Sequence, residues 1–182
     1  MFFLDEVGFN VSMRINYGRA RVGERPVKTT RFIKTRNITV IAVTTPYSLF
    51  LYKIQNTSIN KKNLLKYLKN LLKKIQKEKI ENPLLILDNC RVHKAKKIFN
   101  FFKKNPGLRF KFLPAYSPFL NPIENFFSEW KNFVKRQESE TEEELFQNIE
   151  DIKKVIEPEE FLNYFNLMKK NLFRCLNKEI FY

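Results

Sequence analysis

The sequence predicts an α/β fold in which a mixed five-stranded sheet is flanked by helices, with further helices at the carboxyl end. Two apolar or β-branched runs separated by a short turn predict a hairpin of antiparallel strands. A long segment with helical periodicity then leads into two short apolar runs, which another helical segment separates. Because a helix between two strands connects a parallel pair, we expect an antiparallel hairpin first and parallel strands after it.

The first part of the predicted sheet comprises three strands. Residues 2–4 are a short apolar run that ends at Asp5, so we expect Asp5 at the end of the first strand. Residues 37–45 are rich in β-branched side chains and predict a buried strand. A turn at 46–48 separates this strand from its antiparallel partner at 49–54.

The second part alternates helices with strands. Residues 60–80 carry leucines on one helical face and lysines elsewhere, which predicts an amphipathic helix. The uninterrupted apolar run at 84–87 predicts a central strand covered on both faces, with Asp88 directly after it. A helix over 94–104 and a short strand over 109–113 follow. These two strands form the parallel part of the predicted sheet.

Three more helices are predicted after these strands. The first begins at Pro122, because Asn121 is a good N-cap and proline suits the first helical position. The second follows Thr141, which can form a capping box with Glu144, and the third begins at Pro158. Apolar side chains at helical spacing give each helix a packing face. They are Ile123, Phe127, Trp130 and Val134, then Leu145, Ile149, Ile152 and Ile156, and finally Phe161, Phe165, Met168 and Leu172.

The composition indicates one globular domain, residues 1–182. Apolar residues make up 43% of the chain and aromatic residues 15%, which is enough for a core. No apolar run approaches the roughly 20 residues of a membrane span, and the first residues lack the basic segment of a signal peptide. Cys90, Cys175 and a single histidine supply neither a disulfide framework nor a structural zinc site, so we expect a reducing compartment.

The charge is unevenly distributed along the chain. The formal net charge is +15, with 28 basic and 8 acidic side chains in residues 1–136 but 6 basic and 11 acidic in residues 137–182. A basic body with a pI near 9.8 indicates a polyanionic partner such as nucleic acid. A lysine-rich surface encoded by an AT-rich genome would also explain the charge. We therefore distinguish a basic body from acidic C-terminal helices.

Eight basic side chains lie between positions 14 and 36, with Glu24 as the acidic side chain in this stretch. Gly18, Gly23 and Pro26 interrupt the segment, which predicts a loop or a loose hairpin. Cations on such a loop can hold phosphates, or can form a solvated edge that prevents aggregation between strands. The basic residues are Arg14, Arg19, Arg21, Arg25, Lys28, Arg31, Lys34 and Arg36.

Three carboxylates stand at positions that the predicted fold can bring together. If the strands ending at Asp5 and Asp88 are neighbours, both side chains lie at the carboxyl edge of the sheet, where ligands bind in open α/β sheets. Glu124 lies in the first turn of the helix from Pro122. Converging carboxylates repel one another unless a cation lies between them, and oxygen ligands favour Mg²⁺ or Mn²⁺. Two such ions, about 3.5–4 Å apart, support phosphoryl transfer on nucleic acid. Alternatively, Glu124 only completes a capping box with Asn121.

Three segments carry a resemblance to a known family. The runs LDEVGF, ILDNCRVHK and PAYSPFLNPIENFFSEWK resemble the catalytic segments of the DDE transposase superfamily, of the Tc-mariner type, and 35 residues lie between the second and third acids. The resemblance implies a ribonuclease H-like fold, with cleavage and joining of transposon ends that depends on Mg²⁺ or Mn²⁺ in a two-metal site. It makes Asp5, Asp88 and Glu124 the catalytic metal ligands.

The same resemblance implies supporting residues and partners. Asn89, His93 and Asn121 match positions that accompany the three acids in the family motifs. DNA is the implied partner, as transposon ends and as target, and the implied active form is a homodimer in the nucleus, or in the cytoplasm of a prokaryote. Transposases of this family carry helix-turn-helix modules before the catalytic domain. Because Asp5 lies so near the first residue, we expect no such module here, and instead a remnant, a separate recognition polypeptide or a start placed too late.

Several of these side chains have simpler interpretations. Asn89 could form a turn after a strand, and His93 could cap the next helix or contact the DNA backbone. Cys90 is expected to be a small core residue. Tyr116 and Trp130 could stack on bases, although we favour aromatic packing for both.

The remaining assignments concern Glu6 and the DNA-contacting cations. On a strand, Glu6 would point to the face opposite Asp5, so we do not assign it to the catalytic set. A non-catalytic nucleic-acid-binding relic remains an alternative function. An RNA-cutting nuclease of the same fold is another, which the motif over 121–124 disfavours. For contacts with DNA we assign Arg14, Arg19, Arg21 and Arg25 in the loop, and Lys131 and Lys135 in the helix from Pro122.

Overall fold

The computed structural model describes residues 1–15, 17–27, 29 and 36–179. Most boundaries agree with the sequence-based ones to within about two residues. The elements are β1 (Phe2–Phe9), β2 (Ile38–Thr44), β3 (Leu49–Gln55), α1 (Lys61–Lys77), β4 (Leu84–Leu87), α2 (Lys96–Lys104), β5 (Arg109–Phe112), the 3₁₀ turn η1 (Pro118–Leu120), α3 (Pro122–Arg136), α4 (Glu142–Glu150), the 3₁₀ turn η2 (Asp151–Lys154) and α5 (Pro158–Leu176).

The five strands form one mixed sheet in the order β3-β2-β1-β4-β5. β1 pairs antiparallel with β2, and β2 pairs antiparallel with β3. The pairs β1–β4 and β4–β5 are parallel. The predicted α/β fold, with an antiparallel hairpin followed by parallel strands and flanking helices, is therefore confirmed.

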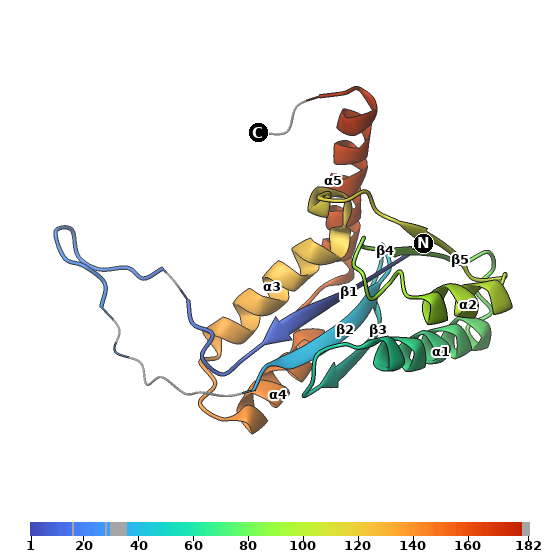
Figure 1. The fold of residues 1–182 in the computed structure, drawn as a ribbon. Helices are drawn as coiled ribbons and strands as arrows, with labels where there is room; N and C mark the ends of the chain where they lie inside the picture. Colours follow the sequence, from blue (N-terminus) through green and yellow to red (C-terminus); the bar gives the residue numbers. More distant parts are fainter. Residues whose placement is uncertain (16, 28, 30–35, 180–182) are drawn as a thin grey trace.

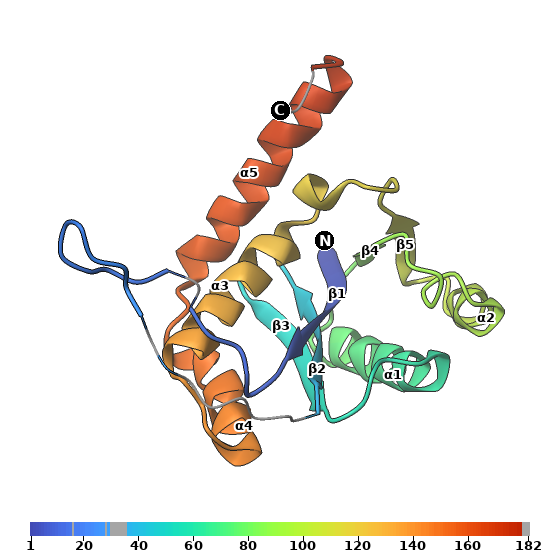
Figure 2. The ribbon, with the colours of Figure 1, turned by 60° about the vertical axis from the view of Figure 1, so that its left-hand side comes forward.

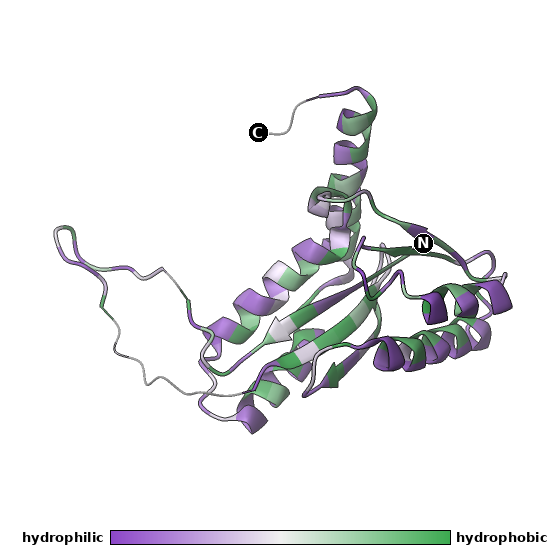
Figure 3. Ribbon diagram, in the orientation of Figure 1, coloured by the Kyte–Doolittle hydropathy of each residue, from purple (hydrophilic) through white to green (hydrophobic). Residues whose placement is uncertain are grey.

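Helices cover both faces of the sheet, as Figures 1 and 2 show. α1 and α2 lie side by side on one face, whereas α3 and α4 cover the other face and α5 packs along α3. Each face has its own apolar cluster, one shared with α1 and α2 and the other with α3, α4 and α5. In Figure 3 the strands are largely hydrophobic, while the helices alternate hydrophobic and hydrophilic residues as amphipathic helices do.

β1 contributes alternate side chains to the two clusters. Phe3 and Val7 join the cluster under α3, and Leu4 joins the cluster under α1 and α2. Because successive side chains of a strand point to opposite faces, Asp5 lies on the α3 side and Glu6 on the α1 side. The expectation that Glu6 points away from Asp5 is confirmed.

Trp130 is the centre of the cluster between the sheet and α3. Its side chain is fully buried, and its ring lies 5.6 Å from that of Phe9 and 5.8 Å from that of Tyr52. Its indole N–H donates to the carbonyl oxygen of Ile149, so the buried polar atom has a partner. Aromatic packing, which the sequence favoured for Trp130, is confirmed, and this packing fixes the position of α3 on the sheet.

The capping box predicted for α4 forms only in part, and the helix is shorter than expected. The hydroxyl of Thr141 accepts from the Glu144 N–H, but the Glu144 carboxylate accepts from the Glu140 N–H instead of returning to Thr141. α4 ends at Glu150 and the chain continues in the 3₁₀ turn η2, so Ile156 lies beyond both. The predicted continuous helix through Ile156 is therefore wrong.

The segment between β1 and β2 is a projecting loop wherever it is described (Figure 1). Arg19, Arg21 and Arg25 are exposed, whereas Arg14 is half-buried and donates to the carbonyl oxygens of Val11 and Met13. The loop prediction is confirmed for the described part, while Lys28, Arg31 and Lys34 lie outside the described residues. No described helix is both long enough and apolar enough to cross a membrane.

Candidate active site

The pairing of β1 with β4 places Asp5 beside Asp88. Leu4 of β1 pairs with Leu87 of β4 in the parallel register, and an aspartate directly follows each of these two leucines. Asp88 follows the end of β4, as predicted, but Asp5 lies in the middle of β1, which continues to Phe9 along β2. The expectation that Asp5 ends its strand is wrong, because β1 has a long partner on one side and a four-residue partner on the other.

Asp5 is a buried carboxylate whose two oxygens both accept hydrogen bonds. Only 6% of the residue is exposed. Its Oδ1 accepts from the Glu6 N–H at 2.7 Å, and its Oδ2 accepts from the Asn121 side-chain amide at 2.8 Å. Burial, together with the negative charges of Glu124, Asp88 and Glu6, raises the pKa of Asp5 to about 8 despite the Glu6 hydrogen bond.

Asn121 links the first catalytic segment to the third. It stands at the N-cap position of α3, as predicted, but its side chain makes no capping bond and turns instead toward Asp5. The side chain is 3% exposed, so its bond to Asp5 is buried. The capping box that would have explained Glu124 is therefore absent, and that simpler interpretation is wrong.

Glu124 lines a cavity at the start of α3. Its side chain is exposed, and among the described residues none donates a hydrogen bond to its carboxylate. The cavity has a volume of about 440 Å³, and Asp88, Asn89, Asn121 and Glu124 all line it. Asp5 lies behind Asn121 and interacts electrostatically with both acids of the cavity wall.

His93 lies between Asp88 and Glu6 on the α1 side of the sheet. Its Nδ1 contacts Asp88 Oδ1, which also accepts from the Cys90 N–H at 3.1 Å, and its Nε2 lies 3.1 Å from Glu6 Oε1. The residue is completely buried, so it does not contact a DNA backbone, and the N-cap of α2 is Ala95. Both simpler interpretations of His93 are therefore wrong.

The two carboxylates determine the charge of His93. Burial on its own lowers the pKa of His93, but the hydrogen bonds to Asp88 and Glu6 and their negative charges raise it to about 10. Burial alone would raise the pKa of Asp88, but the hydrogen bond and the charge of His93 hold it below its ordinary value. At neutral pH the three groups form a carboxylate–imidazolium–carboxylate chain.

Glu6 is the residue that sequence reasoning left out of the site. Its position on the opposite face of β1 was predicted correctly, but its link to Asp88 through His93 was not. A signal was present: Glu6 is a carboxylate on a buried strand and needs a partner, and the only histidine of the chain follows Asp88 by five residues.

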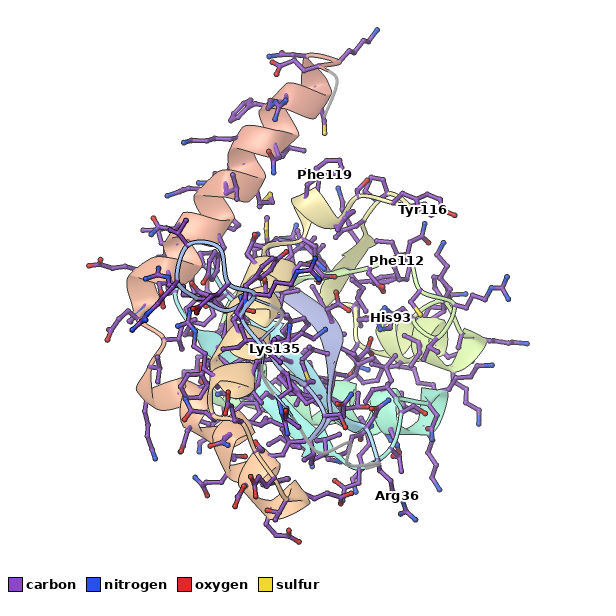
Figure 4. The ribbon with its side chains drawn as sticks, turned by 90° about the vertical axis from the view of Figure 1, so that its left-hand side faces the viewer. Arg36, His93, Phe112, Tyr116, Phe119 and Lys135 are labelled. Carbon is purple, nitrogen blue, oxygen red and sulfur yellow. The ribbon has the colours of Figure 1, made fainter. Side chains whose placement is uncertain are left out.

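The segments that rim the cavity correct two further predictions. Cys90 is exposed, because the chain turns at the surface as it leaves β4, and it is not a core residue. Tyr116 is 98% exposed, with a φ of 57°, and lies at the rim of the cavity, so the aromatic packing that the sequence favoured for it is wrong (Figure 4). Asn89 Oδ1 is buried and has no hydrogen-bond partner among the described residues, which leaves this amide oxygen available to a ligand.

The assigned DNA-contacting lysines lie along α3. Lys131 and Lys135 follow Glu124 by seven and eleven residues, so all three share one face of the helix. α3 leads from the cavity toward the side of the molecule from which the basic loop projects (Figure 1). Their contact with DNA, and that of Arg14, Arg19, Arg21 and Arg25, stays a prediction.

The carboxylate oxygens of the three acids repel one another, but they suit a divalent cation. Among the described residues, no three histidine, cysteine or acidic side chains already surround one point as ligands do. However, Asp88 and Glu124 line the cavity with Asp5 close behind it, and burial first, then repulsion from these two acids and from Glu6, raises the pKa of Asp5. Hard oxygen donors of this kind suit Mg²⁺ or Mn²⁺. The residues therefore fit the metal that the resemblance implies.

This sheet order, with acids on β1, after β4 and at the start of α3, defines a ribonuclease H-like protein. A family model described as DDE superfamily endonuclease matches residues 1–146, so the chain belongs to the DDE superfamily of endonucleases. No curated protein sequence matches the chain.

Solved structures of Mos1 transposase share the fold. A pre-cleavage Mos1 transpososome matches with a TM-score of 0.84 and 14% identity, over 100% of this chain and 56% of that one. The Mos1 mariner paired-end complex with Mg matches with a TM-score of 0.81 and 16% identity, over 100% of this chain and 56% of that one. The Mos1 catalytic domain matches with a TM-score of 0.75 and 14% identity, over 100% of this chain and 83% of that one. The chain thus spans little more than half of the longer Mos1 chains.

Proposed function

We propose that this chain is a transposase catalytic domain that cleaves and joins DNA with divalent metal held by Asp5, Asp88 and Glu124. The observation that supports the proposal most strongly is the placement of the three carboxylates: Asp88, after β4, and Glu124, on α3, line one cavity, and Asp5, on β1, lies directly behind Asn121 of its wall. Burial, and then the charges of Glu124, Asp88 and Glu6, raise the pKa of Asp5 to about 8, and a cation bound beside these acids would favour its ionised form. Membership of the DDE superfamily supports the same assignment.

The residues have distinct tasks in this scheme. Bound Mg²⁺ or Mn²⁺ would activate a water or a 3′-hydroxyl and stabilise the leaving oxygen of a phosphodiester. Asn121 holds Oδ2 of Asp5, and the Cys90 N–H together with His93 holds Oδ1 of Asp88, so both aspartates are fixed before substrate arrives. Glu124 faces the cavity from the helix that carries Lys131 and Lys135, which we propose contact the DNA backbone.

The proposed partners follow from the same site. Arg14, Arg19, Arg21 and Arg25 would hold further phosphates of the transposon end or of the target. Mos1 transposase has been solved as a paired-end complex and as a strand transfer complex, which supports DNA as substrate. A homodimer as the active form is part of the same proposal. The Mn and Mg complexes of Mos1 support these ions as cofactors. We place the activity in the nucleus, or in the cytoplasm if the chain is prokaryotic.

A cleavage assay tests the proposal. Supercoiled plasmid and a linear duplex are incubated with the purified chain and Mg²⁺, Mn²⁺, Ca²⁺ or EDTA. We expect nicked or cut products with Mg²⁺ or Mn²⁺ only, loss of products with Asp88→Ala, and no loss with Glu143→Ala, which removes an exposed carboxylate of α4. Equal activity of the Asp88→Ala variant would reject the assignment.

A second function has one observation in its favour. Among the described residues no three ligands are already arranged around a metal, which is compatible with a transposon remnant that binds nucleic acid without chemistry. Such a relic would bind duplex DNA in a salt-dependent way with little sequence preference. The same assay separates the two, because the relic gives no metal-dependent product at any enzyme concentration.

A further inference from the structure

The two helices on the α1 side of the sheet carry positive charge without any acidic side chain. α1 contains seven lysines and α2 contains four, and neither helix contains aspartate or glutamate. In contrast, α3, α4, η2 and α5 on the other face together contain nine acidic and eight basic residues. An AT-rich genome would raise lysine everywhere, so it does not explain why the charges are segregated between the two faces of the sheet.

The fold gathers part of this charge around one groove. α1 and α2 lie side by side (Figure 2), and a groove of about 560 Å³ runs between them. Lys69 and Lys73 line it from α1, and Lys97 and Lys104 line it from α2. We call these four residues and the space between them the lysine groove. The residues are far apart in the sequence, so only the packing of the two helices brings them together.

The charges of the lysine groove are not used within the protein. All four lysines are exposed, and none of them forms an ion pair with any described residue. Lys74, one residue along α1, differs: it is half-buried, donates to the carbonyl oxygen of Phe50 and pairs with Glu78. The fold thus uses Lys74 for packing and leaves the four groove lysines to solvent.

The size of the groove suits the backbone of a duplex. On α1 its lining extends from Leu65 to Gln76, which is about 16 Å at 1.5 Å per residue. This length corresponds to roughly five base-pair steps of B-DNA at 3.4 Å each. Lysine ammonium groups act as point charges toward phosphate, with little demand on geometry, so they suit contacts that do not depend on sequence.

We propose that the lysine groove is a second DNA-binding surface, which holds the phosphate backbone of duplex DNA on the face of the sheet opposite α3. It is separate from the arginines of the loop and from Lys131 and Lys135. The inference rests on the proposed function for the identity of the polyanion. It adds that the bound DNA contacts the protein beyond the carboxylate cavity, through contacts that carry no sequence information.

The experiment measures DNA affinity as a function of salt. Fluorescence anisotropy follows a 30-base-pair duplex of arbitrary sequence binding to the chain in EDTA, in an Asp88→Ala background, between about 50 and 300 mM salt. The test variant replaces Lys69, Lys73, Lys97 and Lys104 by glutamine. Since each lost phosphate contact lowers the slope of log K against log salt by about 1, we expect a slope smaller by about 2–4 and an affinity lower by roughly 10–100-fold at 100 mM salt.

Two control variants keep the result specific. One replaces the same four lysines by arginine and should bind as the parent does, because the charge is kept. The other removes four exposed lysines from the opposite face and should lose less than about threefold. Its substitutions are Lys154→Gln, Lys169→Gln, Lys170→Gln and Lys178→Gln. Circular dichroism melts confirm that all variants fold.

The outcomes separate this inference from the proposed function. Equal losses in the test variant and in the opposite-face control, or an unchanged salt slope in the test variant, would overturn it. Labelled polyglutamate is titrated in the same way as a second probe. Loss of its binding in the test variant with unchanged DNA binding would also overturn the inference, by showing that the groove takes an acidic polypeptide. Because binding is measured without metal in a cleavage-deficient background, absence of cleavage by the parent chain would not alter any of these outcomes.

Discussion

The three carboxylates of the site differ in how the protein holds them. The pairing of β1 with β4 places Asp5 beside Asp88, which directly follows β4. Hydrogen bonds from Asn121 and from backbone N–H groups, together with the ion pair to His93, fix their oxygens. Glu124 comes from the first turn of α3, is exposed, and receives no hydrogen bond from any described residue. The fold therefore holds two of the proposed metal ligands in place, whereas no described residue holds the third.

This difference separates stability from chemistry. A side chain held by buried partners contributes to the fold as well as to the site, so its replacement disturbs both. A side chain that only faces a cavity can be replaced with a loss of activity alone. Variants of the three carboxylates and of the residues that hold them therefore test this contrast.

Replacing either acid of the cavity, Asp88 or Glu124, should abolish DNA cleavage, but only the replacement of Asp88 should lower the stability of the fold. We expect Asp88→Asn and Glu124→Gln each to lower metal-dependent DNA cleavage by about 10³-fold, because each removes an anionic ligand of the metal. Asp88→Asn should also lower the melting temperature, since His93 loses a charged partner in a buried position. Glu124→Gln should leave it unchanged. Initial cleavage rates and thermal melts measure both, and a lower melting temperature for Glu124→Gln would contradict the contrast.

The second prediction concerns the pH dependence of stability caused by Asp5. Its pKa in the folded protein is about 8, well above the ordinary value near 3.8, so the folded state binds more protons than the unfolded state between these values. Stability should therefore fall as pH rises from about 4 to about 8, by about 3 kcal/mol between pH 5 and pH 8.

Asp5→Asn isolates this contribution. Urea unfolding in EDTA at pH 5 and pH 8 gives the free energy of unfolding, and the wild-type protein should lose more of it than the variant does. His93, whose pKa is raised to about 10, also loses stabilisation as pH rises above 6.5, but it does so in both proteins. The same pH dependence in the variant and in the wild type would contradict the prediction, because it would show that folding does not raise the pKa of Asp5.

The sequence predicted the sheet well because its strands have unambiguous patterns. The β-branched run that became β2 and the four-residue apolar run that became β4 could be placed from composition and from neighbouring turns. The exact end of β1 could not, because strand length depends on the partner, and β2 is long enough to carry β1 past Asp5 to Phe9. The placement of Asp5 beside Asp88 was predicted only on the condition that their strands are neighbours, and the observed order, with β1 next to β4, meets that condition.

The site was predicted as a set of residues but not as a set of contacts. Asn121 at an N-cap position has a local use for its side chain, and only the folded chain shows that Asp5 takes that side chain instead. Glu6 and His93 lie 87 residues apart, so no local pattern reveals their hydrogen bond. Motif resemblance marks which residues gather at a site, whereas the partners that hold them depend on tertiary packing.

Removing Asn121, which donates a hydrogen bond to Asp5, should have a smaller effect than replacing one of the three acids. In Asn121→Ala, Oδ2 of buried Asp5 loses its donor, which should destabilise the fold at pH 8 by about 1–3 kcal/mol. The pKa of Asp5 should rise further, so the loss should be smaller at pH 5. Asn132→Ala, at an exposed position of the same helix, controls for the loss of an asparagine from α3. Urea midpoints at the two pH values measure the effect, and equal losses at both would contradict it.

The smallest effect is expected at Glu6, which reaches Asp88 only through His93. Glu6→Ala leaves His93 with one carboxylate partner in place of two, so its pKa should fall below the value near 10 and Asp88 should be held less firmly. We expect a loss of cleavage of at most about tenfold, whereas Glu6→Gln, which keeps an acceptor oxygen, should retain more of it. An NMR titration of the single histidine measures its pKa directly, and Glu81→Ala removes an exposed carboxylate as a control. If the His93 pKa is the same in Glu6→Ala and Glu81→Ala, the chain from Glu6 to Asp88 does not operate, and Asp88 is fixed by His93 and the Cys90 N–H alone.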